Sequence, residues 1–177
     1  VCGEYISNEV LPYLNSLGID PIKEGAKKIN KVQVSTAKGN LIKGELPLGG
    51  FGMSRYFLDI LLMKKAQTNG VEVLKDAVNS VVFKKGVFTV QTKDSKYFQS
   101  KITIGAFGKR SLLDFKMNRD FIKRKSPYLA VKMHVKGDFP EDLIALHNFK
   151  GGYCGVSKVE NNLICLLYTS PSPRDTI

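Results

Sequence analysis

Apolar residues recur along the chain at two spacings, one typical of helices and the other typical of strands. The clearest helix begins after Ser54, a favoured N-cap, and ends before Gly70, a favoured C-terminal residue. Its apolar side chains lie on one face at helical spacing: Phe57, Leu58, Leu61, Leu62 and Ala66. An earlier helix is predicted over residues 10–17, where Pro12 removes an interior hydrogen bond and so requires a kink or a later start.

Strand-like runs outnumber the helical ones. Two hairpins are predicted, over residues 29–47 around a Lys-Gly-Asn turn and over residues 78–91 around a Lys-Lys-Gly turn. Further strands are predicted at residues 71–74, 97–98, 102–106, 129–135, 143–149 and 153–156. Residues 48–52 are expected to form a flexible glycine-rich loop. Because strands dominate and no repeat occurs at a fixed period, an α+β fold fits better than a regular βαβ series.

The formal net charge of +11 favours an anionic partner. Nucleotide phosphates, an acidic carrier protein, nucleic acid and a membrane surface all fit this charge. We interpret the basic residues between positions 109 and 125 as a solvated face, because Phe115 and Phe121 lack the spacing of a base-stacking platform. No nucleic-acid partner is therefore expected. No apolar run reaches the roughly 18 residues that a membrane-spanning helix needs.

The histidines and cysteines suggest no metal site. His134 and His147 have no cysteine or carboxylate at metal-ligand spacing. His134 also lies opposite the apolar face of the predicted strand 129–135, so we expect its side chain to be exposed. Few cysteines and no secretory signal favour a reducing compartment, and hence a cytoplasmic location.

The end of the sequence differs in character from the rest. Residues 165–175 resemble, codon for codon, the translation of a transposon-derived sequencing adapter. We therefore expect residues 165–177 to be an adapter-derived artefact without regular structure. The natural sequence would then be a piece cut at both ends, residues 1–164. An ordinary Ser/Pro-rich linker is the alternative.

Three short segments carry candidate chemistry. Cys2, Gly3 and Glu4 could bring a thiol and a carboxyl group close to a cofactor, although a lone cysteine is more often a small buried apolar residue. Arg55 is an unusual cation for a first helical turn, which indicates a phosphate partner or, equally well, a solvated side chain. Residues 104–111 join a buried-type strand to Gly and Ser, where α/β proteins bring the backbone against a nucleotide.

Taken in order, these segments resemble motifs of FAD-dependent oxidoreductases of the geranylgeranyl-reductase, aromatic-hydroxylase and flavin-dependent-halogenase class. Residues 1–4, Val-Cys-Gly-Glu, are similar to the turn that faces the flavin in that class. The helix that starts with Arg55 resembles its R-x-x-F-D-x-x-L-x-x-x-A motif. Residues 70–78, 104–111 and 151–153 are similar to its G-x-x-V strand, its I-G-A-D-G-x-x-S segment and its G-G-Y turn.

The resemblance implies a partial glutathione-reductase-like FAD-binding fold with hairpin insertions in residues 1–111. It implies a partial antiparallel β-rich substrate domain in residues 112–164. Six residues would bind FAD: Gly3, Arg55, Val78, Gly105, Ala106 and Gly108. Cys2 and Glu4 would be catalytic residues near the flavin ring, and Tyr153 would contact the substrate.

Two positions depart from the family pattern. Phe107 stands where the family has Asp, which disfavours a hydroxylase that binds a pyridine nucleotide in the usual way. Cys154 follows the G-G-Y turn where the family has Trp, so the substrate pocket differs as well.

We therefore expect a reductase or dehydrogenase of a small apolar substrate, such as an isoprenoid or polyene, either free or carrier-bound. A flavin monooxygenase or halogenase is the alternative among enzymes, and a basic nucleic-acid- or carrier-binding module is the alternative from another class. The chain lacks both phosphate-binding motifs of the family, so this piece alone is expected to be inactive. The electron donor and any peripheral membrane association stay open.

Overall fold

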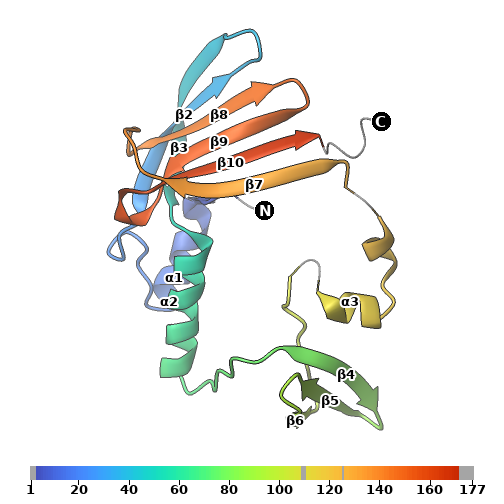
Figure 1. The fold of residues 1–177 in the computed structure, drawn as a ribbon. Coiled ribbons are helices and arrows are strands. Elements are labelled where there is room, and N and C mark those ends of the chain that lie inside the picture. Colours follow the sequence, from blue (N-terminus) through green and yellow to red (C-terminus); the bar gives the residue numbers. More distant parts are fainter. Residues whose placement is uncertain (1–2, 109–110, 125, 172–177) are drawn as a thin grey trace. The chain divides into compact units, whose positions relative to one another are not determined.

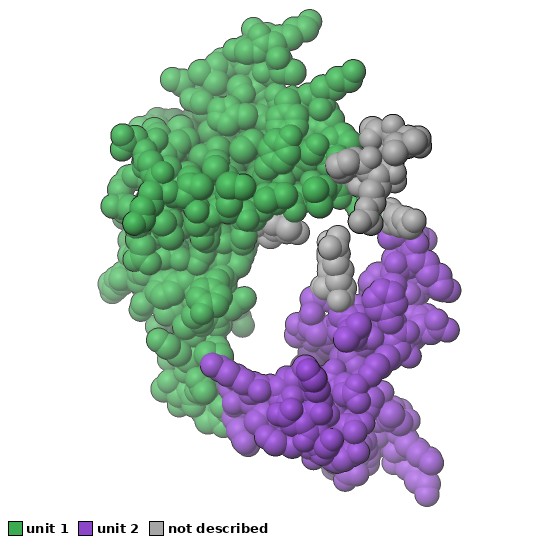
Figure 2. Space-filling model, in the orientation of Figure 1, with its two compact units in different colours: residues 1–71, 126–177 green, residues 72–125 purple. Residues whose placement is uncertain are grey.

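The structure, a computed structural model, describes residues 3–108, 111–124 and 126–171. The chain forms two compact units, which are coloured separately in Figure 2. Unit 1 comprises residues 1–71 and 126–177, and unit 2 comprises residues 72–125. These compact units divide the chain at other positions than the predicted division near residue 111 between a cofactor domain and a substrate domain, which stays a prediction. Unit 1 joins two stretches that are far apart in the sequence, because their strands pair in one sheet.

Unit 1 is built on a seven-stranded sheet with the order β1-β3-β2-β8-β9-β10-β7 (Figure 1). Only β2 and β8 pair in parallel among its strands, and the other pairs are antiparallel. Its strands are β1 (Tyr5–Ser7), β2 (Lys27–Ser35), β3 (Leu41–Gly52), β7 (Tyr128–Val135), β8 (Leu143–Phe149), β9 (Gly152–Lys158) and β10 (Ile164–Pro171). Its helical elements are η1 (Asn8–Val10), α1 (Leu11–Ser16), α2 (Arg55–Thr68) and η3 (Glu160–Asn162).

Unit 2 contains a smaller antiparallel sheet with the order β4-β5-β6. Its strands are β4 (Val78–Lys84), β5 (Val87–Thr92) and β6 (Tyr97–Ser100), and its helical elements are α3 (Leu112–Lys116) and η2 (Asp120–Lys123). The mixed α+β class predicted from the sequence is confirmed. No helix in the described part of the chain is both long and apolar enough to cross a membrane.

Several local predictions are confirmed by the backbone. The Ser54 hydroxyl accepts a hydrogen bond from the Phe57 N–H and so caps α2. Helix α1 begins at Leu11, so Pro12 lies in the first turn, where its missing N–H costs nothing. The β4–β5 hairpin turns at Lys85 and Gly86, which both have positive φ, as a tight hairpin turn requires.

The glycine-rich segment 48–52 is not a loop but the end of β3, where it pairs with β1 and β2. Glycine serves close packing at this point. A Cβ atom on Gly52 would lie 1.9 Å from the carbonyl oxygen of Lys158, and one on Gly50 would lie 2.4 Å from the Tyr5 ring. The prediction of a flexible loop is wrong because glycine permits close backbone approach as readily as it permits flexibility.

The predicted strands 71–74 and 102–106 do not form. Both segments have the apolar composition of strands, but neither pairs with a neighbouring strand among the described residues. Ile102 and Ile104 are 79% and 85% exposed. Apolar residues make a strand only when another strand satisfies the backbone groups, so composition alone overestimated the sheet.

The expectation that residues 165–177 lack regular structure is wrong for residues 165–171. These residues belong to β10, which pairs with β9 on one side and β7 on the other. Ile164, Cys165 and Leu167 are buried. Backbone pairing does not depend on particular side chains, so an apolar segment can occupy the position between two strands. Residues 172–177 lie outside the described part.

The core of unit 1 lies where the two helices pack at one end of the sheet (Figure 1). It is built from small groups of residues that are distant in the sequence: Ile6, Leu14, Ile19, Ala26, Phe51, Met53 and Leu58. Phe51 and Met53 flank Gly52 and are fully buried. The end of β3 therefore joins the sheet to α2 and fixes where that helix begins.

Replacing Gly52 tests this close packing. Gly52→Ala is expected to lower the free energy of unfolding by about 1–3 kcal/mol, because the new methyl group overlaps the Lys158 carbonyl. Urea unfolding followed by circular dichroism measures the change. Gly44→Ala in the same strand is the control. Its Cβ would meet only Val32 Cγ1 at 3.7 Å, so stability should stay the same or rise by up to about 1 kcal/mol. Equal effects of the two substitutions would contradict the prediction.

Candidate functional site: buried carboxylates at the start of helix α2

The N-terminus of α2 is closed by two carboxylates of the protein itself. The Ser54 N–H donates to Glu160 Oε2 at 2.8 Å, and the Ser54 hydroxyl donates to Glu160 Oε1. The Arg55 N–H faces Glu4 Oε1 at 3.4 Å. A helix N-terminus carries partial positive charge and unpaired N–H groups, so two carboxylates are well placed there. The N–H groups of Ser54 and Arg55 are therefore already bonded to carboxylates of the chain itself.

Glu4 is the centre of this arrangement. Its side chain is 1% exposed, and it accepts hydrogen bonds from Lys132 Nζ at 2.7 Å and from His134 Nε2. Lys132 and His134 project from β7, more than a hundred residues away in the sequence. Their side chains keep 29% and 31% of their surface exposed, so both reach solvent while their inner atoms hold the buried carboxylate. A buried carboxylate needs such partners to remain charged.

The electrostatics of Glu4 follow from two opposing causes. Burial raises the pKa of its carboxyl group. The hydrogen bonds and positive charges of Lys132 and His134 act in the opposite direction and together outweigh burial. The pKa of Glu4 therefore lies below its ordinary value of 4.5, and the side chain is a carboxylate at neutral pH.

His134 is an exposed residue on the face of β7 opposite Val131 and Met133, as expected. The sequence did not predict that this face, which also carries Lys132, meets the buried Glu4 carboxylate. The apolar face is exposed as well, with Val131 and Met133 at 42% and 48%. The buried charge of Glu4 favours this arrangement, because leaving a buried carboxylate unpaired costs more than exposing the apolar side chains.

The described residues also bring three potential metal donors together. One ligand atom from each of Glu4, His134 and Cys165 lies within 4.8 Å of the others. However, burial and the neighbouring Glu4 charge raise the pKa of the Cys165 thiol to about 12, so it is not a thiolate. The Lys132 ammonium group already donates a hydrogen bond to Glu4 Oε1, where a metal ion would bind. These features favour an ion-pair network over a metal centre.

The predicted site residues of unit 1 fall into three groups. Cys2 lies outside the described residues. Glu4 lies at the start of α2, where its Oε1 faces the Arg55 N–H, and Gly3 lies against Leu167 on β10. Tyr153 lies on β9. Register pairs Tyr153 with Thr169 on β10, and Thr169 with Ala130 on β7, so Tyr153 lies on the same sheet face as Lys132 and His134.

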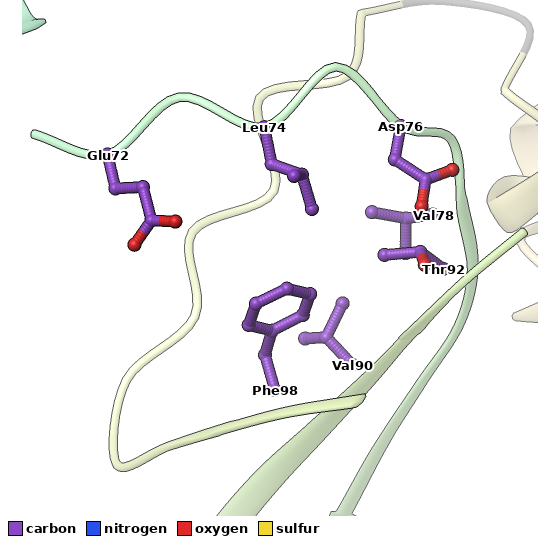
Figure 3. Close-up of a pocket in the computed structure, with 7 residues that line it drawn as sticks. All are labelled: Glu72, Leu74, Asp76, Val78, Val90, Thr92 and Phe98. Carbon is purple, nitrogen blue, oxygen red and sulfur yellow. The ribbon is translucent and has the colours of Figure 1, made fainter. Parts of the chain in front are cut away.

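The remaining predicted residues lie in unit 2. Val78 lines a cavity of about 290 Å³ between β4, β5 and the segment before them. Figure 3 shows Leu74, Val90 and Phe98 converging on this cavity, with the carboxylates of Glu72 and Asp76 at its rim. The other three residues do not line it: Gly105, Ala106 and Gly108. They lie in an irregular, exposed segment, and only Gly108 has a positive φ, of 70°.

Sequence reasoning missed Lys132, His134 and Glu160. Two of them carried a usable signal, because strand alternation places Lys132 and His134 on one face. Glu160 carried none, because it lies in the short turn η3, where Asn161 and Asn162 both adopt positive φ. Only the folded sheet brings that turn to Ser54.

Comparison with known proteins gives matches in structure alone. Neither a protein-family model nor a curated protein matches the sequence. Among solved structures, the peptidyl tryptophan dihydroxylase QhpG aligns with 98% of this chain at a TM-score of 0.70 and 19% identity. The flavin-dependent brominase Bmp2 aligns with 97% at a TM-score of 0.75 and 18% identity. Klebsiella pneumoniae HpxO, complexed with FAD and uric acid, aligns with 98% at 0.72 and 14% identity.

The chain spans 38%, 47% and 48% of the lengths of these three proteins, respectively. At such identities the similarity concerns the fold. The mixed α+β architecture with its curled sheet is thus shared with flavin-dependent monooxygenases and halogenases.

Acid titration tests the buried Glu4 network. Because its folded-state pKa is depressed, Glu4 stabilises the fold above its ordinary value of 4.5, and this contribution is lost as pH falls through the folded-state value. Glu4→Gln is expected to cost about 1–3 kcal/mol at pH 7, and this difference should shrink below pH 4.5. Urea unfolding at a series of pH values measures it. The exposed Glu24→Gln is the control, and a pH-independent loss at Glu4 would refute the network.

A second substitution tests the cap between Ser54 and Glu160. Ser54→Ala removes the hydroxyl that both caps Phe57 N and bonds Glu160, so it is expected to lower the free energy of unfolding by about 1–3 kcal/mol. Ser16→Ala removes only an exposed local bond to the Tyr13 carbonyl and should change stability by no more than about 0.5 kcal/mol. Thermal or urea unfolding compares the two, and similar losses would argue against a special role for Ser54.

Proposed function

We propose that this chain is part of an FAD-dependent oxidoreductase of the oxygenase or halogenase kind. The observation that carries the proposal is the similarity in fold, over nearly the whole chain, to a dihydroxylase, a brominase and an FAD-bound enzyme. The motif series in the sequence supports it independently, since Glu4 and Arg55 from two of these motifs meet in space. The glutathione-reductase-like arrangement of the cofactor domain remains our prediction.

The residues present are compatible with FAD. In unit 1, Gly3 and Arg55 would face the cofactor, because both lie beside the buried carboxylate cluster at the start of α2. In unit 2, Val78 lines an apolar cavity large enough for a nucleobase ring. Gly108 has a backbone conformation that favours glycine, which supports its placement with Gly105 and Ala106 along the cofactor. FAD would supply the electron chemistry, while the protein binds and orients it.

A monooxygenase or halogenase reaction is favoured over the reductase or dehydrogenase reaction expected from the sequence. The sequence alone favoured a reductase or dehydrogenase of an apolar substrate. The solved structures of similar fold instead include enzymes named as a dihydroxylase and a brominase, which favours the alternative. A small apolar or carrier-bound substrate, an unidentified electron donor and a cytoplasmic location remain part of the proposal.

A flavin spectrum tests the proposal directly. The full-length protein that carries this chain is purified and its absorbance recorded between 300 and 550 nm, before and after addition of FAD. We expect the two flavin bands, their loss on reduction with dithionite, and rapid oxygen consumption when air is readmitted. A protein that stays colourless with added FAD would refute FAD dependence. A reduced flavin that is stable in air would point back to a reductase or dehydrogenase.

Arg55 provides a sharper test in the same protein. Arg55→Ala is expected to weaken FAD binding by about 1–3 kcal/mol, the scale of a hydrogen bond to a charged group. Fluorescence quenching of FAD on titration measures the affinity. Lys64→Ala, on the exposed part of the same helix, is the matched control and should leave the affinity unchanged. An unchanged affinity of Arg55→Ala would show that Arg55 does not contact FAD.

A further inference from the structure

We propose that the outer face of α3 and η2 binds the surface of an anionic lipid membrane. This surface, the α3 face, consists of the exposed side chains of Leu112, Phe115 and Phe121 together with the basic side chains of Lys123 and Arg124. All five residues belong to unit 2. The inference goes beyond the proposed function, and it uses neither FAD nor any residue of β10.

Helix α3 turns an acidic side chain inward and apolar side chains outward. Leu113 and Asp114 are buried, whereas Leu112 and Phe115 are 76% and 61% exposed. Water favours the opposite arrangement for three of these four residues, because burial of an apolar side chain is favourable and burial of a carboxyl group is costly. The outer side of α3 therefore has the composition of a surface that meets an apolar phase.

The interior of unit 2 compensates the buried Asp114 only weakly. Within the described part of the chain, neither carboxyl oxygen of Asp114 accepts a hydrogen bond. Its ion-pair partner is Arg119, whose Nη1 lies 3.6 Å from Oδ1 and whose side chain is half-exposed. Such a pair contributes little to stability. Apart from the burial of Leu113, little inside unit 2 favours this orientation of α3, which points to its outer side as the reason.

The backbone of α3 is already hydrogen-bonded, unlike that of the other exposed apolar segments of unit 2. The Leu113 N–H donates to the Ser111 hydroxyl, and the Asp114 N–H donates to the Ser111 carbonyl oxygen. Residues 102–106 instead have strand-like composition and no strand partner in the described part of the chain. Another strand would suit that segment. A membrane suits α3, because residues that enter lipid need a backbone that is satisfied internally.

The end of α3 is bonded to the small sheet. Lys116 Nζ donates to the Asn79 carbonyl oxygen at 2.8 Å and also to its side-chain oxygen. Asn79 belongs to β4, so α3 lies beside that strand (Figure 1). Phe115 is thus placed between the buried Asp114 and the bonded Lys116. Its outward orientation is fixed by contacts on both sides.

The charge of unit 2 identifies the kind of surface that it meets. Residues 72–125 contain thirteen basic and five acidic residues, a net charge of +8 out of +11 for the whole chain. Residues 109–125 alone carry a net charge of +5. Each basic residue near an anionic membrane strengthens binding about fivefold.

Basic and apolar side chains lie next to each other on the α3 face. Lys123 and Arg124 follow Phe121 closely in the sequence, and all three are exposed. Lys123 also pairs with Asp120 at 3.1 Å, but both side chains are largely exposed, so the pair is weak. The sequence alone predicted a solvated basic face here. The exposed Leu112 and Phe115 add an apolar part, which favours lipid over nucleic acid because a duplex offers phosphates and few apolar groups.

Vesicle co-sedimentation with the full-length protein that carries this chain tests the inference. One set of vesicles contains phosphatidylcholine with about 30% phosphatidylglycerol, and the other contains phosphatidylcholine alone. At a salt concentration of about 0.15 M, we expect the apparent dissociation constant to be at least tenfold lower for the anionic vesicles. Equal binding to both kinds of vesicle, or binding to neither, overturns the inference.

A pair of phenylalanine variants tests the apolar part of the face. Phe115→Ser is expected to weaken binding to anionic vesicles about tenfold, because it removes an aromatic ring from the lipid interface. Phe83→Ser in β4 is the matched control, since Phe83 is 60% exposed and is also followed by two lysines. It should leave binding unchanged. Circular dichroism confirms that both variants are folded, and equal losses would overturn the assignment to the α3 face.

A pair of charge variants tests the basic part. Lys123→Gln combined with Arg124→Gln should weaken binding to anionic vesicles at least tenfold. Lys84→Gln combined with Lys93→Gln removes the same charge from exposed positions elsewhere in unit 2. That control should weaken binding no more than about twofold, because charges away from the contact are screened by salt. Equal losses would indicate a general effect of net charge and would contradict a defined face.

Two further outcomes identify a different occupant. If the 177-residue chain binds anionic vesicles but the full-length protein does not, the α3 face is covered within that protein and the inference fails. Fluorescence anisotropy with a labelled DNA duplex tests nucleic acid. Tighter binding to the duplex than to anionic vesicles would also overturn the inference. The flavin spectrum is a separate measurement, so this proposal and FAD dependence can fail independently.

Discussion

The buried carboxylate of Glu4 is the interaction on which the described site depends. It lies where the N-terminal segment, helix α2 and strand β7 meet, and it contacts a donor from each of the latter two. A charge this deeply buried is tolerated only when it is fully paired. The requirement brings the inner atoms of Lys132 and His134 to Glu4 while both side chains still reach solvent. Glu4 thereby links β7 to the start of α2.

Glu160 is a second buried carboxylate at the start of α2. It lies in the β9–β10 connection and closes the first turn of α2 through Ser54. Gly52, two residues before the N-cap Ser54, is packed against the Lys158 carbonyl. The start of α2 is therefore held by β3, by the turn η3 and by Glu4 at once. A residue such as Arg55, placed at this junction, has a defined position that a surface loop would not provide.

Unit 2 contrasts with this rigidly connected site. Its small sheet leaves apolar segments unpaired, and its cavity is lined by apolar side chains with two carboxylates at the rim. Strand-like segments with exposed isoleucines are unfavourable surfaces in water. The fold of unit 1 thus accounts for the buried carboxylates at the start of α2, whereas unit 2 contains the residues proposed for the nucleotide part of FAD.

The sequence by itself determined what depends on neighbours along the chain. Ser54 capped α2, Lys85 and Gly86 made a tight turn, and alternation located β7, because caps, turns and periodicity are local. Tertiary structure decided which face of β7 meets Glu4, whether the glycines of residues 49–52 bend the chain or pack closely, and which apolar segments pair. Those outcomes depend on groups more than a hundred residues apart, such as Glu4 and His134, whose meeting is governed by the energy of a buried charge.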